Sequence, residues 1–399
     1  MHVLILAQYF PPDMGGSSTR AYNVAKGLTM NNVDVTVITS FPHYPDGNIH
    51  RKYQGKPFTK EKKGKINIIR TFIFPIETKG FLRRVFLFAN FILSSLMGVF
   101  FIKKVDVIWA ANPDIFCLVP SLIFRARYSS PIIFNVDDLS LQDINQLQLA
   151  GSESLMIRIA RIMSSFLYKQ ANAITPISPG YYKAIIEFGV NPNNIHLLLG
   201  GVDLDVFLPK RDSPQVFIVL YSGSFSVAYD FDQIILAAKI LESSHPNIKF
   251  IIQGKGELAP RIIRQIDHQN LLNIEVKEEL LDRSEVSTLL NSSSILLLPL
   301  ADFGSPYLGI SSKLYEYQAV EKPIICIAEG MPSRYIQKTK SGLVVKPGDY
   351  RAIAQAIIYL HDNPSKALEM AINGRSFVEK NISLKKIGTR MKDIMKRVI

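Results

Sequence analysis

Cysteine is scarce in this 399-residue sequence, and its two cysteines, Cys117 and Cys326, lie far apart among apolar neighbours. A disulfide framework or a cysteine-based zinc site needs several cysteines at short spacing, so both are excluded. The low cysteine content also favours a reducing compartment. The seven histidines show no paired ligand spacing, which argues against a histidine-based metal site.

The sequence contains two Asp-x-Asp matches, but neither predicts a metal site. Asp203 with Asp205 falls in a polar linker-like stretch, and Asp230 with Asp232 falls at the start of a predicted helix. A divalent ion needs several oxygen ligands gathered in one place. We therefore expect no metal ion and no other cofactor.

The N-terminus lacks the features of a secretory signal. Its first ten residues, MHVLILAQYF, have no basic n-region and no small-residue cleavage site, and they are typical of a first strand in a cytoplasmic protein. With 47% hydrophobic and 20% charged residues, the chain is neither disordered nor fibrous. The net charge of +12 is concentrated in the N-terminal half, but no nucleic-acid-binding motif accompanies it, so no nucleic-acid partner is expected.

Short apolar runs alternate with segments of helical period, a pattern typical of doubly wound parallel α/β sheets. Residues 1–200 form one Rossmann-like unit with strands predicted at 3–7, 33–39, 66–72, 105–110, 131–136 and 173–176. The polar, proline-containing residues 201–215 predict a linker. Residues 216–375 form a second unit, with strands at 216–221, 248–253, 273–276, 295–299, 323–328 and 342–345, and 376–399 a closing helix. We expect two Rossmann-like domains facing a cleft.

The turn after the first predicted strand carries Gly15 and Gly16 ahead of a helix predicted at 19–30. Paired glycines let the backbone approach a ligand closely, and a helix N-terminus favours an anion. This turn therefore fits either a phosphate or charged acceptor site, or simply a tight strand-to-helix turn. It lacks the G-x-G-x-x-G pattern of dinucleotide-binding turns.

A second candidate site lies in the C-terminal unit, where the segment SSKLYEYQA follows the strand predicted at 295–299. Ser311 or Ser312 can cap a helix, and the first-turn amides, with Leu314 among them, join Lys313 as groups that can hold a diphosphate. Glu316, one turn further on, can reach a ribose diol. The alternative is a capped surface helix with an incidental lysine and glutamate.

Seven collinear segments over nearly the whole chain resemble one family. They are PPDMGGSSTRAYNVAKGL, VTVITSFPHYPDG, GVDLDVFLP, YSGSFSVAYDFDQIILAAKIL, QGKGE, SSKLYEYQAVEKPIIC and SGLVVKPGD. This set is similar to the retaining glycosyltransferases of family 4, which have the GT-B fold, and most similar to the branch of fucosamine transferases of surface-polysaccharide assembly. The resemblance implies a nucleotide-sugar donor in the C-terminal domain and an acceptor on the N-terminal one.

The resemblance also implies roles for individual residues. Glu316 resembles the second glutamate of the family's E-x7-E motif, which binds the nucleotide ribose, whereas the first glutamate is replaced by Leu308. The family's arginine and lysine after the first C-domain strand are also missing, and Ser224 stands near the arginine position. Diphosphate neutralisation is then expected from Lys313 first, from Lys255 next, and from Arg20 across the cleft.

Two further residues are catalytic candidates. Asp137 stands at the end of a predicted N-domain strand, where the resemblance places a histidine, and its carboxylate can accept a hydrogen bond from a sugar hydroxyl. A strand-end turn without a catalytic role is the alternative. His43 follows another predicted strand, so it either reaches the cleft or packs within its loop.

Two segments of the N-terminal unit suggest membrane contact. From Val85 to Ile102 the chain has 18 uncharged residues, which is at the lower limit for a transmembrane helix, and basic pairs flank them. A span here would split one sheet across a bilayer, so we expect either a buried helix or a monotopic one. From Arg51 to Lys65 seven basic residues accompany one acid, which favours anionic headgroups over a merely solvated loop.

Together these features predict a metal-independent, retaining hexosyl-type glycosyltransferase at the cytoplasmic membrane face. Its donor would be a UDP-, GDP- or dTDP-sugar and its acceptor a lipid-linked saccharide or polysaccharide. In this family the acceptor hydroxyl is described as attacking from the front face and giving its proton to the departing phosphate, so no side-chain nucleophile is expected. The alternatives are a sugar-nucleotide 2-epimerase of the same fold and a non-catalytic membrane-attached binding protein.

Overall fold

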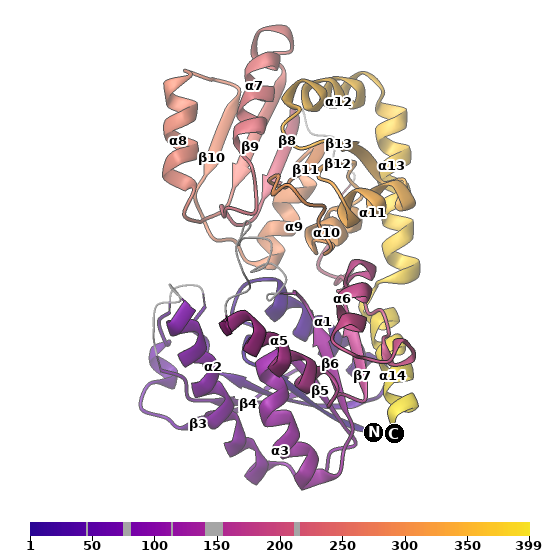
Figure 1. Ribbon diagram of the computed structural model, residues 1–399. Coiled ribbons are helices and arrows are strands. Elements are labelled where there is room, and N and C mark those ends of the chain that lie inside the picture. Colours follow the sequence, from indigo (N-terminus) through magenta and orange to yellow (C-terminus); the bar gives the residue numbers. More distant parts are fainter. Residues whose placement is uncertain (45–46, 75–80, 113–114, 140–154, 211–215) are drawn as a thin grey trace. The chain divides into compact units, whose positions relative to one another are not determined.

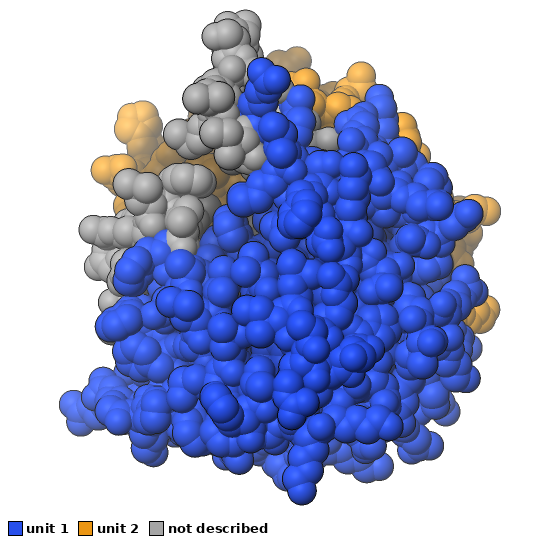
Figure 2. All heavy atoms as spheres, turned by 60° about the horizontal axis from the view of Figure 1, so that its bottom comes forward, with its two compact units in different colours: residues 1–201, 384–399 blue, residues 202–383 orange. Residues whose placement is uncertain are grey.

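The computed structural model describes residues 1–44, 47–74, 81–112, 115–139, 155–210 and 216–399. The chain forms two compact units (Figures 1 and 2). Unit 1 comprises residues 1–201 and 384–399, and unit 2 comprises residues 202–383. The expected closing helix at 376–399 is divided between the units, since residues 376–383 belong to unit 2 and residues 384–399 to unit 1.

Unit 1 is built on a seven-stranded sheet of order β3-β4-β2-β1-β5-β6-β7, in which every neighbouring pair except β3 and β4 is parallel. The strands β1, β2, β5 and β6 have almost entirely buried residues, as expected for a sheet covered on both faces. The elements of unit 1 that precede α14 are β1 (His2–Ala7), α1 (Gly16–Met30), β2 (Asp34–Ser40), η1 (Arg51–Tyr53), β3 (Phe58–Lys63), β4 (Ile66–Thr71), α2 (Phe81–Ser95), η2 (Leu96–Phe101), β5 (Val107–Asn112), η3 (Ile115–Cys117), α3 (Leu118–Tyr128), β6 (Ile132–Val136), α5 (Leu155–Tyr168), β7 (Ala173–Pro176), η4 (Pro179–Tyr181), α6 (Tyr182–Glu187) and η5 (Pro192–Asn194).

Strand β3 is absent from the sequence prediction, which treated the chain from Arg51 to Lys65 as a basic surface segment. In the structure this segment contains η1 and the antiparallel edge strand β3. Glu61 faces inward and pairs with Arg70 of β4, whose Nε donates to the carboxylate at 2.9 Å. The lysines of FTKEKK are the signal that could have shown an edge strand, because exposed edge strands commonly carry lysine.

The apolar segment from Val85 to Ile102 forms most of α2 followed by η2. Leu87 and Phe91 are buried against the sheet, whereas Leu93 and Phe100 are 70% and 86% exposed. The helix is therefore one-sided, which contradicts the expectation of a fully buried helix. Within the described residues, no helix is both long and apolar enough to cross a membrane.

The last helix of the chain, α14 (Leu384–Val398), packs on α1 within unit 1. The two helices approach most closely at a pair of glycines. A Cβ atom added to Gly27 would lie 2.3 Å from the carbonyl oxygen of Leu384, and one added to Gly388 would lie 2.0 Å from the carbonyl oxygen of Gly27. Asn31 locks this crossing, since its side chain donates to Gly27 O at 2.8 Å and to Lys385 O at 3.0 Å.

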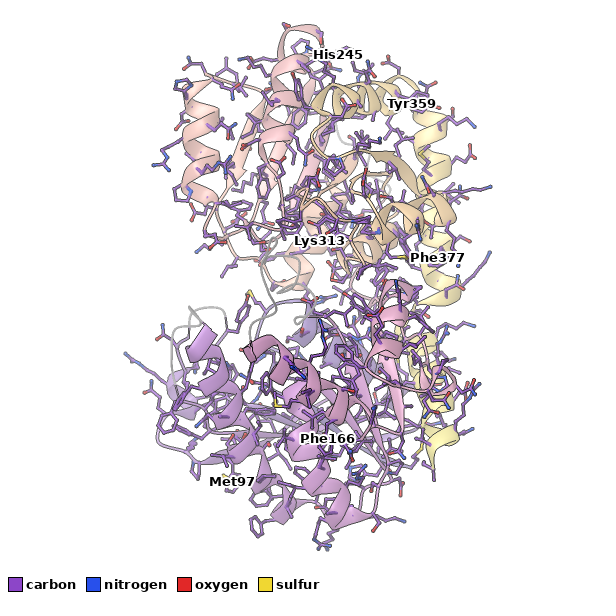
Figure 3. All side chains as sticks on the ribbon, in the orientation of Figure 1. Met97, Phe166, His245, Lys313, Tyr359 and Phe377 are labelled. Carbon is purple, nitrogen blue, oxygen red and sulfur yellow. The ribbon has the colours of Figure 1, made fainter. Side chains whose placement is uncertain are left out.

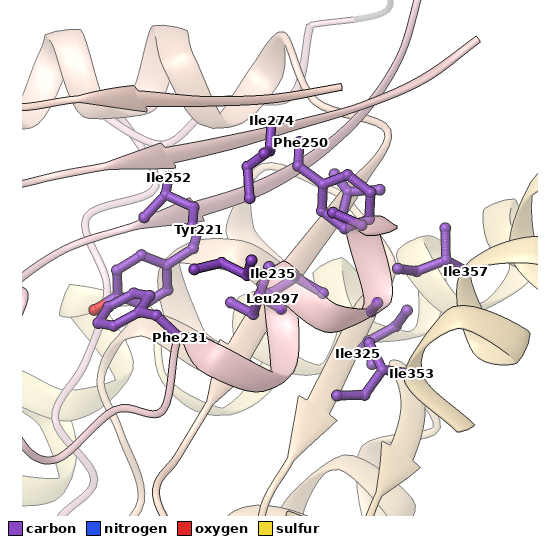
Figure 4. Close-up of a cluster of buried hydrophobic side chains, with 14 of the residues drawn as sticks. Tyr221, Phe231, Ile235, Phe250, Ile252, Ile274, Leu297, Ile325, Ile353 and Ile357 are labelled. Atoms are coloured by element: carbon purple, nitrogen blue, oxygen red, sulfur yellow. The ribbon is translucent and has the colours of Figure 1, made fainter. Parts of the chain in front are cut away.

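Unit 2 contains a six-stranded parallel sheet of order β10-β9-β8-β11-β12-β13. The inward faces of its strands and helices form one apolar core that includes Tyr221, Phe231, Leu297 and Ile353 (Figure 4). Its elements are β8 (Phe217–Ser222), α7 (Asp232–Ser244), β9 (Ile248–Gln253), α8 (Ala259–His268), β10 (Ile274–Lys277), α9 (Arg283–Asn291), β11 (Ile295–Pro299), α10 (Lys313–Ala319), β12 (Ile324–Ile327), α11 (Met331–Thr339), β13 (Gly342–Val345), α12 (Tyr350–Asp362) and α13 (Pro364–Asn381).

Candidate functional site

Both sheets reverse their strand order at one point, and these points locate the candidate site. In unit 2 the chain moves outward in opposite directions from β8 and β11, and in unit 1 from β1 and β5. Ligands of doubly wound sheets bind beyond the carboxyl ends of the strands at such a reversal. A ligand is therefore expected at the loops after β8 and β11 in unit 2, and at those after β1 and β5 in unit 1.

Lys313 occupies the reversal point of unit 2. It is the first residue of α10 and lies in the segment that follows β11 (Figure 3). Its ammonium group donates to the carbonyl oxygen of Ser222 at the end of β8, at 2.8 Å. The ammonium also lies 5.3 Å and 5.8 Å from the ring centroids of Tyr221 and Tyr229. Burial lowers the pKa of Lys313 to about 8, an effect that nearby Glu316 partly opposes.

Gly223 makes room for this lysine. A Cβ atom at position 223 would lie 1.6 Å from the Nζ atom of Lys313, and the backbone φ of Gly223 is +151°. Any side chain there would displace the ammonium, so the glycine is required by the close approach. Ser224, which stands near the arginine position of the family, uses its carbonyl oxygen to accept from the hydroxyl of Tyr221 at 2.7 Å.

Glu316 lies one turn along α10 and forms an ion pair that the sequence did not reveal. Its Oε1 atom is 3.1 Å from Nη1 of Arg283, the first residue of α9. The guanidinium of Arg283 also lies over the ring of Phe207, 4.9 Å from its centroid. Arg283 lies more than 30 residues before Glu316, and no recognisable motif contains both residues. Their contact could therefore be found only from the fold.

Contrary to the sequence prediction, the N-terminus of α10 is not capped by a serine side chain. Ser312 occupies the N-cap position, but its side chain forms no capping hydrogen bond. The amides of Leu314 and Tyr315 already donate to the carbonyl oxygens of Ser311 and Ser312, and the side chain of Leu314 is fully buried. Leu314 therefore contributes core packing, and Lys313 is the main group of this turn that can face an anion.

Lys255 lies in the loop after β9, and this loop packs on the loop after β8. A Cβ atom at Gly254 would lie 1.6 Å from the carbonyl oxygen of Gly223, and Phe225 N donates to Lys255 O at 2.8 Å. The side chain of Lys255 is exposed. The structure therefore brings Lys255 to the same edge of the sheet as Lys313, as a second basic group at its rim.

In unit 1 the glycine turn leads into α1, which begins at Gly16 rather than at residue 19. Gly15 has a φ of +103°, a conformation that favours glycine, and no described atom lies within 4 Å of a Cβ atom added to Gly16. The turn therefore presents open backbone at the carboxyl end of β1, as the sequence predicts for a ligand-binding turn.

Arg20 does not stand ready to reach a diphosphate outside unit 1. It is 5% exposed, and its guanidinium donates to the side chain of Asn135 at 2.8–2.9 Å and to Leu198 O at 2.6 Å. Its Nε atom also lies 2.9 Å from Oδ1 of Asp137. The arginine is used to hold the end of β6 and the chain around Leu198, which weakens its prediction as a donor-binding residue.

Asp137 is held in this same network. Its carboxylate accepts from Asn135 Nδ2 at 2.8 Å, in addition to its ion pair with Arg20. Burial raises the pKa of Asp137, while Arg20 and the hydrogen bonds from Asn135 and Ser17 oppose that rise. The carboxylate is thus fixed in place beside a cation, which suits a positioning group better than a mobile base.

His43 lies at the carboxyl end of the sheet in unit 1 and is 3% exposed. Its ring stacks on Tyr9 at 5.4 Å between centroids, and its Nδ1 atom is 2.9 Å from the carbonyl oxygen of Phe41. Asp13 accepts from the backbone amides of His43 and Tyr44, each at 2.8 Å. His43 therefore packs within its own loop and also lies at the carboxyl edge of the sheet in unit 1.

Gln8 and Asp13, which the sequence prediction missed, lie at the same edge of the sheet as the predicted residue His43. Gln8, the residue after β1, is fully buried. Both amide atoms of Gln8, Oδ2 of Asp13 and Nε2 of His43 are buried without a hydrogen-bond partner among the described residues. Buried polar groups normally find partners, so these atoms form a group of unsatisfied polar atoms at the carboxyl edge of the sheet in unit 1. Their positions directly after β1 and in its turn were the available signal.

Groups of three or more metal-ligating side chains do not occur among the described residues. Cys117 and Cys326 are both buried and form no disulfide with each other. The polar groups at the described strand ends are lysine, carboxylate, amide and imidazole side chains, together with open backbone at Gly16.

Two family models match the chain in tandem. The model described as Glycosyltransferase Family 4 matches residues 14–206, and the model described as Glycosyl transferases group 1 matches residues 209–377. The chain belongs to the family 4 glycosyltransferases. The predicted family is thereby confirmed, whereas the narrower resemblance to fucosamine transferases stays a prediction.

This family 4 glycosyltransferase is also similar to a curated protein of Escherichia coli K12, the putative colanic acid biosynthesis glycosyl transferase WcaI. The two are 24% identical over 294 residues, which cover 69% of this chain and 71% of the relative.

Among solved structures, the sucrose-phosphate synthase of Thermosynechococcus elongatus matches this transferase with a TM-score of 0.76 at 15% identity, covering 100% of this chain and 99% of that one. HepE of Anabaena, solved in complex with UDP-glucose, matches with a TM-score of 0.69 at 14% identity and covers 100% of both chains. At such identities the likeness concerns the fold, and it confirms the predicted two-domain α/β GT-B fold.

Proposed function

We propose that this glycosyltransferase moves a hexosyl-type sugar from a nucleoside diphosphate donor to a lipid-linked saccharide or polysaccharide, with retention of anomeric configuration and without a divalent metal ion. The reaction takes place at the cytoplasmic face of a membrane. The nucleotide is a UDP, GDP or dTDP. UDP and UDP-glucose in the HepE complexes support the choice of a nucleotide-sugar donor.

The position of Lys313 carries this proposal. A buried ammonium group fixed on Ser222 O at the reversal point of the sheet supplies one positive charge where a diphosphate is expected to bind. In a poorly solvated place such a charge interacts more strongly with a developing phosphate charge than it would in water. Lys255 on the neighbouring loop supplies a second charge.

Glu316 is proposed to bind the ribose diol of the donor. Its ion pair with Arg283 orients the carboxylate, so that it can accept hydrogen bonds from the two hydroxyls. Arg283 is a positioning residue in this scheme, because it acts through Glu316.

The sugar passes directly from the donor to the acceptor, so the reaction needs no nucleophile from the protein. The acceptor oxygen forms a bond to the anomeric carbon, and the bond from that carbon to the donor phosphate breaks. The acceptor proton passes to the departing phosphate oxygen, and the nucleoside diphosphate leaves. In unit 1, His43, Asp13 and Gln8 are proposed to orient the acceptor hydroxyls, while Asp137 and Arg20 hold the strand end beside them.

Substitution at the donor site tests the proposal. Lys313→Ala and Glu316→Gln are each expected to lower turnover about a hundredfold or more, since each removes a charged contact to the donor. Lys338→Ala and Glu369→Gln, which change exposed residues of unit 2, serve as matched controls. A Lys313→Ala/Glu316→Gln double variant that folds and turns over at the wild-type rate would overturn the placement.

The assay itself separates the reaction classes. We expect a nucleotide-sugar to raise the melting temperature and product to form only when acceptor is added, with activity retained in a chelator. Isomerisation of the sugar-nucleotide without acceptor would indicate a 2-epimerase, and loss of activity with the chelator would overturn the metal-independent mechanism.

A further inference from the structure

Unit 1 contains a hollow away from the carboxyl edge of its own sheet, where the proposed acceptor groups lie. It has a volume of about 600 Å³ and is lined by His2, Thr36 and Asn67 near the amino ends of β1, β2 and β4. Substrates of doubly wound sheets bind at the opposite, carboxyl ends. This hollow is therefore separate from the candidate site.

Four lysines from two distant parts of the sequence surround the hollow. Lys60 and Lys62 come from β3, and Lys103 and Lys104 come from the chain after η2. The two apparently unrelated features of the sequence, a basic segment and an apolar one, thus meet at a single place. All four side chains are exposed, so they can turn toward a ligand.

The carboxylates nearby do not cancel this charge. Glu61 also lines the hollow, but its carboxylate accepts from Arg70 Nε and from the hydroxyl of Tyr53, each at 2.9 Å. These partners lower the pKa of Glu61 despite its partial burial. Asp106 lies 3.7 Å from Lys104 Nζ, and it also accepts from the backbone amide of His2 at 2.7 Å. Most of the lysine charge therefore remains for an anion.

Aromatic residues lie directly beside the lysines. Phe101 lines the hollow and packs on Phe58 at 4.5 Å between ring centroids, and Lys60 Nζ lies 4.1 Å from the Phe101 centroid. Its neighbour Phe100 is 86% exposed, and Leu93 of α2 is 70% exposed. An exposed phenyl ring next to a group of lysines is typical of proteins that lie on a membrane, because the ring enters the acyl boundary while the lysines meet the headgroups.

We propose that this hollow binds the phosphate headgroup of an anionic phospholipid and so attaches unit 1 to the membrane surface. Four lysines complement a phosphate in charge, and Phe100 argues for a lipid rather than a free phosphate, because a soluble anion would leave the ring in water. The inference rests on the membrane contact of the proposed function and names the site and ligand for it.

Vesicle flotation with the full chain tests this inference. Wild-type protein is expected to bind vesicles of phosphatidylglycerol mixed with phosphatidylcholine, and to bind vesicles of phosphatidylcholine alone much more weakly. The variant Lys60→Gln/Lys62→Gln/Lys103→Gln/Lys104→Gln is expected to lose about fivefold in affinity per lysine removed, since each basic residue near an anionic surface contributes about that factor. The single variant Phe100→Ser, at an exposed position, should also weaken binding.

A second quadruple variant controls for net charge. It carries Lys249→Gln, Lys338→Gln, Lys380→Gln and Lys386→Gln, all exposed lysines outside the hollow, and should bind vesicles as the wild type does. Equal losses in both quadruple variants would overturn the inference in favour of general charge attraction. Binding of inorganic phosphate, seen as a melting-temperature rise that only the first variant loses, would overturn it in favour of a soluble anion if vesicles are not bound.

Donor binding separates this inference from the proposed function. Both quadruple variants should keep the melting-temperature rise caused by a nucleotide-sugar, because none of their lysines lies at the donor edge. If vesicle binding is absent while donor binding and sugar transfer persist, the lipid site is wrong and the proposed transfer stands.

Discussion

Lys313 shows, at the scale of single residues, how a buried charged group can reduce the stability of its own fold. A buried ammonium group loses solvation that one carbonyl and two aromatic rings only partly replace. Its lowered pKa has the same origin, because burial disfavours the charged form. An anion that binds beside Lys313 replaces part of the solvation that the ammonium group lost on burial.

The variant Lys313→Met should therefore stabilise unit 2 while weakening donor binding. At pH 7 we expect its free energy of unfolding to rise by on the order of 1–2 kcal/mol, because the buried charge is removed. The folded-state pKa, about 8, lies below the usual value of 10.5, so the wild type carries the full penalty below pH 8 and loses it as the pH rises toward 10.5. Thermal unfolding of both proteins at pH 7 and pH 10 measures this, and a less stable methionine variant at pH 7 would contradict it.

Donor affinity should depend on pH through the same lysine. In the proposed scheme the protonated form of Lys313 binds the diphosphate, so affinity for UDP is expected to fall above about pH 8, by up to about tenfold per pH unit. Calorimetric titration at several pH values measures the slope. Lys313→Arg keeps its charge throughout this range and should show no such fall. A wild-type affinity that stays constant to pH 10 would exclude Lys313 from the diphosphate site.

Arg20 and Asp137 form a buried ion pair, so the contribution of each residue to stability depends on the other. Arg20→Ala is expected to lower the free energy of unfolding by about 3–5 kcal/mol, because it leaves the buried Asp137 carboxylate without its cation. Adding Asp137→Asn should recover part of that loss. Denaturant unfolding of the two single variants and the double variant measures the coupling, and strictly additive losses would show that the ion pair contributes nothing.

At the scale of elements, two glycines decide how helices α1 and α14 pack. Their backbones touch at Gly27 and Gly388, and a side chain on either would overlap the other helix. The result is a glycine-to-glycine crossing fixed by hydrogen bonds from Asn31. This contact attaches the end of the chain to its beginning.

Gly27→Ala should consequently destabilise unit 1, although alanine is the better helix former. We expect a loss of about 1–3 kcal/mol from overpacking against Leu384 O. Gly16→Ala, in the first turn of the same helix, meets no described atom within 4 Å and should be neutral or slightly stabilising. Thermal unfolding of the two variants provides the comparison, and equal effects would refute the packing argument.

At the scale of the whole molecule, the chain leaves unit 1 near residue 201, builds unit 2, and returns at residue 384. The returning helix buries Ile387, Met391 and Met395 against unit 1. Unit 1 therefore depends on a segment that is distant in sequence, whereas unit 2 is continuous.

Deletion of residues 384–399 should lower the stability of unit 1 alone. We expect its thermal transition to fall by at least about 5 °C, because several apolar side chains lose their buried contacts, while unit 2 keeps its transition. UDP binding, which we assign to unit 2, should persist. Differential scanning calorimetry with and without UDP measures both effects, and a parallel fall of the two transitions would contradict the division into independent units.

Strand ends and helix starts were the most predictable parts of this fold. The predicted positions of Lys313 at the start of α10 and of Asp137 after β6 agree with the structure, because strand ends and helix starts have local signals such as an apolar run followed by serine or glycine. Strand β3 was missed, since an edge strand with three lysines resembles a charged loop. Roles within the site stay proposals.

The sequence by itself determined the fold class, the family and the residues at the strand ends, because these depend on periodicity and on short motifs that act within one or two turns. Only the tertiary structure decided which of those residues meet. It paired Glu316 with Arg283, enclosed Arg20 within unit 1, and gathered four lysines beside Phe101. The reason is physical: a side chain's partners come from strands and helices far apart in sequence, and their distances are set by sheet order and packing rather than by any local pattern.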